Sequence, residues 1–151
     1  MGKIISARSA QYPLYAELTF NFDDTVVPVS GGTPITGSRE VDFGKTNTLE
    51  TVVRAIPLPI GATVIGGSVT TDVAFDAASY TVKVGDSASA ARYLGATDKK
   101  GLGTTALVPT GYVGDGEDVQ VTITSADVCT TGKMTVRVGF TVANRMSEVV
   151  L

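Results

Sequence analysis

Apolar and polar residues alternate with a period of two along much of this chain, and this alternation restricts the fold more than any other feature. In the segment 134–142 every second residue is apolar, namely Met134, Val136, Val138, Phe140 and Val142. Successive side chains of a β-strand point to opposite faces, so this period is typical of a strand with one buried face. Val and Thr, β-branched residues that favour strands, occur 21 times each among the 151 residues. We therefore expect an all-β protein.

The same alternation recurs in short segments separated by Gly, Pro, Asn and Asp. It predicts strands at 15–22, 49–56, 65–75, 80–84, 104–109, 119–124 and 133–143, with brief strands at 25–29 and 41–43. Only residues 86–94 favour a helix, of one or two turns, because Asp86 or Ser87 can cap its first turn. We expect an antiparallel two-sheet β-sandwich or jelly roll, with an extended N-terminal arm and at most one short helix.

The stretch 56–75 is the longest predicted strand region. Pro57 and Pro59 cannot donate to a sheet ladder, so the chain enters this region outside the sheet. The Gly66-Gly67 pair predicts a bulge or a sharp bend. The alternation predicts one buried face, formed by Ile65, Val69, Val73 and Phe75. We expect the substitution Gly67→Val to lower the folding yield.

Three regions follow from the patterning: an extended arm (1–14), a β-sandwich domain (15–143) and a C-terminal tail (144–151). The arm, the polar loop 33–48 and the apolar end of the tail are the predicted contact surfaces. Of the tyrosines, we expect Tyr12 and Tyr15 at an interface and Tyr80 at a sheet rim. The candidate interface residues are Lys3, Arg8, Tyr12, Tyr15, Arg39, Phe43, Val149 and Leu151.

Residues that catalyse reactions or bind metals are scarce. The chain has no histidine, which excludes His-dependent triads and His-liganded zinc. Cys129 is the only cysteine, and it is expected to be a small core residue of a protein made in a reducing compartment. Asp23-Asp24 and the loop holding Asp115, Glu117 and Asp118 offer oxygen ligands for Ca²⁺, but their spacing fits no calcium motif and suits ordinary solvated turns. We expect no cofactor, no metal and no enzymatic activity.

Charge and hydropathy limit the partners. The net charge is −3 and the longest basic run is Lys99-Lys100, so a nucleic-acid partner is not expected. No apolar run approaches the ~20 residues of a membrane span, and residues 1–11 lack a secretory pattern, so we expect neither membrane insertion nor export by that route.

Four segments together resemble small β-rich structural proteins of tailed phages. They are IPLPIGATVIGG (56–67), YTVKVGDSASAARYLGAT (80–97), TGYVGDGEDVQVTIT (110–124) and TTGKMTVRVGFTV (130–142). The resemblance covers roughly residues 49–142 and points to capsid decoration or cement proteins of the jelly-roll type.

This resemblance implies a virion protein that is assembled in the host cytoplasm and binds the exterior of the capsid. Its partner would be the major capsid protein, whose neighbouring subunits it would bridge as a dimer or trimer. A glycan-binding or fibre-associated β-sandwich module is the alternative, and an enzyme is a third possibility. The first two differ in their aromatic residues, which would cluster in an open groove for sugar and spread along flat faces for a capsid protein.

Overall fold

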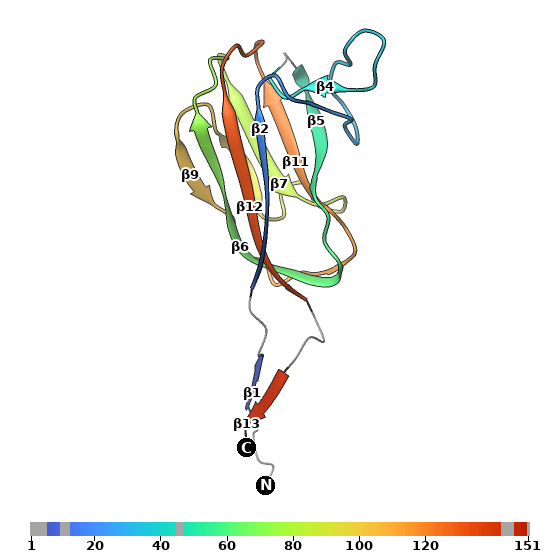
Figure 1. The fold of residues 1–151 in the computed structure, drawn as a ribbon, viewed down its shortest axis with the longest axis vertical. Coiled ribbons are helices and arrows are strands. Elements are labelled where there is room, and N and C mark those ends of the chain that lie inside the picture. The colour runs from blue at the N-terminus through green and yellow to red at the C-terminus, as the bar shows by residue number, and fades with distance from the viewer. Residues whose placement is uncertain (1–5, 10–12, 45–46, 143–146, 151) are drawn as a thin grey trace.

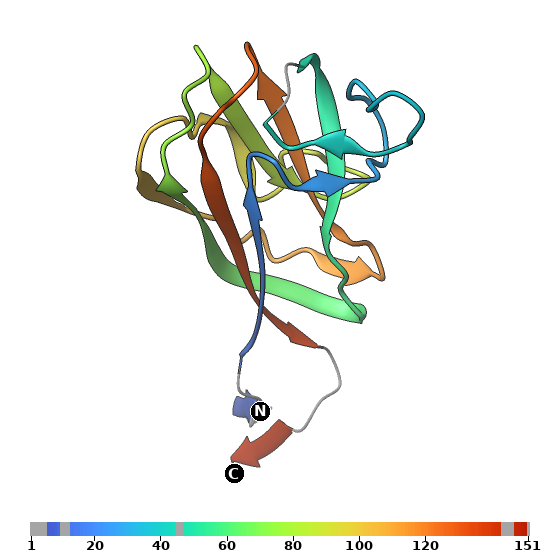
Figure 2. The ribbon, with the colours of Figure 1, turned by 45° about the horizontal axis from the view of Figure 1, so that its top comes forward.

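The computed structural model describes residues 6–9, 13–44, 47–142 and 147–150 of the chain. Two antiparallel sheets face each other, and a thin two-stranded ribbon projects from one end of them (Figures 1 and 2). The described residues contain no helix, and therefore no helix that is long and apolar enough to span a membrane. The predicted all-β sandwich is confirmed.

The first sheet follows the order β10 (Val113–Asp115), β6 (Ile60–Val73), β12 (Lys133–Val142) and β2 (Leu14–Asn21), with β9 (Gly103–Ala106) also pairing with β6. The second follows the order β5 (Asn47–Ile56), β11 (Val119–Ser125), β7 (Tyr80–Gly85) and β8 (Leu94–Asp98). A small pair, β3 (Thr25–Val26) and β4 (Val41–Asp42), lies beside the second sheet (Figure 1).

The core lies between the two sheets and is built from the predicted alternating positions. The first sheet contributes Phe20, Val69, Met134, Val136 and Val138, and the second contributes Val53, Val82, Val84, Val119, Val121 and Ile123. Rings stack within it, Phe20 on Phe43 with centroids 4.0 Å apart and Phe75 on Tyr80 at 3.8 Å. Burying each such side chain contributes about 1.5–3 kcal/mol.

Strand β6 contains the predicted bulge, but the bulge changes which residues are buried. Pairing with β12 steps from Gly139 opposite Gly66 to Phe140 opposite Val64, so Ile65 is an extra residue. Val64 is therefore buried and Ile65 is 42% exposed. A second register shift near Asp72 leaves Val73 46% exposed. The prediction that Ile65 and Val73 are buried was wrong, because a bulge reverses the faces beyond it.

Three further predictions need correction. Residues 86–94 form turns and the start of β8, and Asp86 accepts hydrogen bonds from the backbone N–H groups of Ala88 and Ser89 (3.0 and 2.9 Å) without a helix following. The loop holding Asp115, Glu117 and Asp118, expected to be a solvated turn, begins with β10 (Val113–Asp115). Tyr80 is fully buried instead of lying at a rim, and its hydroxyl donates to the Phe43 carbonyl oxygen (2.8 Å).

The chain ends form the projecting ribbon. Strands β1 (Ser6–Ser9) and β13 (Ser147–Val150) pair antiparallel, with Arg8 opposite Glu148 and Ala7 opposite Val149. We call these two strands the terminal ribbon. The arm expected from the sequence thus includes a strand that pairs with the C-terminal tail.

Candidate functional site

The predicted interface residues that the structure describes do not form one surface. Lys3, Tyr12 and Leu151 lie outside the described residues, while Arg8 and Val149 lie in the terminal ribbon. Tyr15 is exposed at the ribbon end of β2, and Arg39 is exposed in the loop between β3 and β4, at the far end of the sandwich (Figure 1). Phe43 is 7% exposed, so its assignment to a contact surface is corrected to the core.

Tyr15 covers a glycine on the outer face of the first sheet. It lies opposite Gly139 in the β2–β12 ladder, and a Cβ added to Gly139 would lie 2.9 Å from the Tyr15 ring. The ring therefore packs on the strand backbone while 68% of the residue stays exposed. An exposed aromatic ring held in this way is a typical contact residue, because it buries area at little entropic cost.

An ion pair lies next to Tyr15 on the same face. The Arg137 Nε and Nη2 atoms donate to Oε2 of Glu17 at 3.1 and 2.9 Å. Both side chains are at least half exposed, so this pair contributes little to stability. Together with Ala16 and Tyr15, these residues line an open surface hollow of about 520 Å³.

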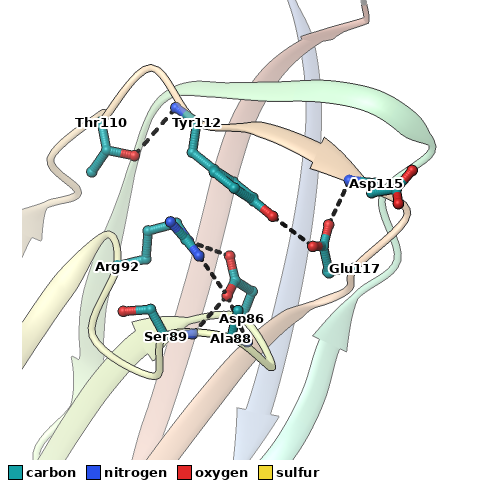
Figure 3. Close-up of polar contacts among 8 residues, drawn as sticks. All are labelled: Asp86, Ala88, Ser89, Arg92, Thr110, Tyr112, Asp115 and Glu117. Atoms are coloured by element: carbon teal, nitrogen blue, oxygen red, sulfur yellow. Dashed lines mark hydrogen bonds and ion pairs between the residues drawn. The ribbon is translucent and has the colours of Figure 1, made fainter.

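A polar network fastens the loops at one end of the sandwich (Figure 3). Asp86 is 3% exposed and forms an ion pair with Arg92. The Arg92 guanidinium lies 3.7 Å from the centre of the Tyr112 ring, and the Tyr112 hydroxyl donates to Oε1 of Glu117 (2.6 Å). The other Glu117 oxygen accepts from the Asp115 N–H (2.6 Å). The network thus links the loop after β7 to the segments on both sides of β10.

The pKa shifts in this network follow from the same bonds. The hydrogen bond from Tyr112 lowers the pKa of Glu117, and it raises the pKa of Tyr112 itself. The hydrogen bond to Asp86 raises the pKa of Arg92. The charged groups Asp86, Arg92 and Glu117 each bind a partner within the network. The arrangement therefore holds the loops together and does not resemble an acid/base pair that is free to bind a substrate.

Two of the remaining candidates for chemistry, Asp118 and Cys129, are also engaged in structure. Asp118 pairs with Arg54 (2.9 Å), and no group of three or more Cys, Asp or Glu side chains in the described part of the chain could hold a metal. Cys129 is 4% exposed, and burial raises the pKa of its thiol, so the prediction of a small core residue is confirmed. The role of Arg92 in this network could not be predicted from the sequence, because the loop that brings it to Asp86 and Tyr112 was predicted as a helix.

A groove runs between the edges of the two sheets, where β2 faces β5. Its volume is about 400 Å³. Its lining comprises five apolar residues, Leu18, Phe20, Val26, Phe43 and Val53, and four polar or charged residues, Thr19, Asp24, Thr25 and Arg54. We call this the edge groove.

Comparison with known proteins gives similarity in fold. No protein-family model and no curated protein matches the sequence. Among solved structures, a chain of the acid-stable capsid of Helicobacter pylori bacteriophage KHP30 is similar over 95% of this chain and 98% of its own length, with a TM-score of 0.61 and 17% identity. A chain of the cyanophage Pam1 capsid is similar over 93% of this chain and 87% of its own, with a TM-score of 0.50 and 18% identity. The protein thus shares its fold, along nearly its whole length, with chains of two phage capsids.

Proposed function

We propose that this protein is a structural component of a phage virion that binds the outer surface of the major-capsid lattice and stabilises it by bridging neighbouring subunits. The observation that carries the proposal is the shared fold with the KHP30 capsid chain, which extends over 95% of this chain and 98% of that chain. A fold by itself does not define a function. The arrangement of the surface adds support.

The described surface suits association better than catalysis. The members of its charged network bind one another, and its exposed residues include Tyr15 and apolar side chains such as Ile60, Leu102 and Val108. Many identical contacts of this kind act together on a lattice, because each bound site raises the effective concentration for the next. The proposed role is purely associative, with no reaction catalysed.

The alternative of a glycan-binding module has less support. Sugar recognition would require aromatic rings gathered in an open groove. Among the described residues, the aromatic side chains are mostly in the core, and Tyr15 is the one that is largely exposed. It lies on an open sheet face beside an ion pair, which favours a contact surface for protein.

The test is binding to preformed capsids that lack this protein. We expect the full chain to co-sediment with them and to raise their thermal disruption temperature. Because β2 begins at Leu14, a variant lacking residues 1–12 keeps every strand of the sandwich and should fold, yet it should no longer bind. Normal occupancy by the truncated protein would show that the arm is not a capsid contact, and failure of the full chain to bind would refute the proposed function.

A further inference from the structure

Strand β2 has an open edge that lacks the usual protection. It is the last strand of its sheet, its pairing with β12 is unbroken from Asn21 to Leu14, and no strand of the described residues pairs with its other side. Exposed edges are normally blocked by bulges, prolines or lysines. Within β2 there is none of these, and its one charged residue, Glu17, is paired with Arg137.

The neighbouring edge of the second sheet is covered at Val52, near the middle of β5, whereas no described strand covers the edge of β2. On β5, the carbonyl oxygen of Val52 accepts from the Val29 N–H (2.7 Å), and the Val52 N–H donates to the Ser30 carbonyl oxygen (2.9 Å). The chain before β4 thus pairs with the outer edge of β5 at Val52. An added strand therefore finds its backbone partners on β2.

The edge groove lies where the side chains of an added strand would point. Every second side chain of a strand beside β2 would enter it and meet Leu18, Phe20 and Phe43. This geometry suits a short extended segment.

Charge at the groove indicates a basic occupant. Asp24 lines the groove and accepts hydrogen bonds from the backbone and side chain of Asn21, while Glu40 accepts from the Thr25 hydroxyl. These donors are uncharged, and the one cation that lines the groove, Arg54, is already paired with Asp118. Residues 1–14 of this chain carry Lys3 and Arg8 and no carboxylate.

The terminal ribbon contains Arg8 of that segment, which lies opposite Glu148 in β13, and it has little support in its own subunit. Its strands have four residues each, and an isolated two-stranded ribbon is at best marginally stable in water. It prolongs the β2–β12 pair past Leu14 and Phe140, so it leads away from its own edge groove (Figures 1 and 2). In a second copy, the same groove is open to it.

We propose that the open edge of β2 and the edge groove receive the terminal ribbon of a second copy of this chain, with β1 of that copy lying as an added strand beside β2. Each subunit then donates one ribbon and accepts one, so the exchange closes into a dimer or a small ring. This inference goes beyond the proposed function and does not depend on capsid binding.

Mixing two single-cysteine variants in the Cys129→Ala background tests the contact directly. One partner carries Thr19→Cys on β2, and the other carries a cysteine at Ala7, Arg8 or Ser9 in turn. Because each chain has only one thiol, no disulfide can form within a chain. A disulfide that joins the two different variants therefore reports a contact between subunits. We expect at least one β1 position to form this heterodimer with Thr19→Cys, and none to form it with the control Thr104→Cys, which is exposed on β9.

Light scattering supplies a second readout without cysteines. The full chain should have a mass above the 15.6 kDa of one subunit, and removal of residues 1–9 should return it to the monomer mass. A full chain that is monomeric at every concentration, or cross-linking at Thr104 equal to that at Thr19, overturns the inference. Capsid binding is measured separately by co-sedimentation. If no cross-link forms but the protein still binds capsids, the ribbon exchange is refuted and the proposed function is not.

Discussion

Substituting Gly67 by alanine should destabilise the sandwich strongly, whereas the same change at its neighbour Gly66 should not. Gly67 has φ of 140°, a conformation that residues with a side chain rarely adopt, and an added Cβ would lie 2.2 Å from the Arg137 carbonyl oxygen of β12. That oxygen belongs to the central strand pair of the sheet and cannot move freely. A Cβ at Gly66 would meet no atom within 4 Å.

The expected size follows from these two costs. A side chain in a disfavoured backbone region costs on the order of 1–3 kcal/mol, and overpacking against a rigid neighbour costs about 1–3 kcal/mol more. We expect Gly67→Ala to lower the free energy of unfolding by roughly 2–6 kcal/mol, with Gly67→Val at the upper end or unfolded, and Gly66→Ala to stay within about 0.5 kcal/mol of wild type.

Urea unfolding followed by circular dichroism measures both variants. For a chain of this size, even 2 kcal/mol lowers the melting temperature by about 4–8 °C, which thermal scans resolve. The reasoning is refuted if Gly67→Ala and Gly66→Ala are equally stable, because the bulge would then not require a glycine.

Three further predictions concern the loop network and the core. Arg92→Ala leaves the Asp86 carboxylate buried without its cation, so it should cost about 2–3 kcal/mol in urea unfolding, while Ala91→Ser on the adjacent exposed position should be neutral; equal stability would show that the ion pair is dispensable. The hydrogen bond from Tyr112 holds the pKa of Glu117 below its ordinary 4.5, so the stability it provides is present at neutral pH and is lost as the pH falls through the lower, folded-state value. Glu117→Gln should therefore flatten the dependence of unfolding free energy on pH below about 4.5, and an unchanged acid slope would contradict the assignment. Cys129 is buried and its thiol pKa is raised, so a thiol reagent should label it in urea but scarcely in the native protein; rapid native labelling would contradict its placement in the core.

The alternation of side chains was sufficient to predict the long central strands. β12 lies where the alternation from Met134 to Val142 indicated, and β2 differs from its prediction by one residue at each end. Local turn signals also located β3 and β4. These features depend on residues close in sequence, which is why pattern alone revealed them.

Features set by tertiary contacts could not be predicted in the same way. The bulge at Ile65 was anticipated from Gly66-Gly67, but which residue becomes the extra one depends on the register with β12. Likewise, the Asp86–Arg92 pair closes a turn that local capping rules assigned to a helix, and Tyr80 is buried because Phe75 stacks on it. The open edge of β2 follows only from the strand order.

The most direct test of the proposed function is electron cryo-microscopy of capsids reconstituted with this protein. We predict density for the sandwich on the outer surface, in contact with at least two neighbouring major-capsid subunits. Capsids that show no added density at saturating protein, or density confined to the interior or to a single subunit, would contradict the account.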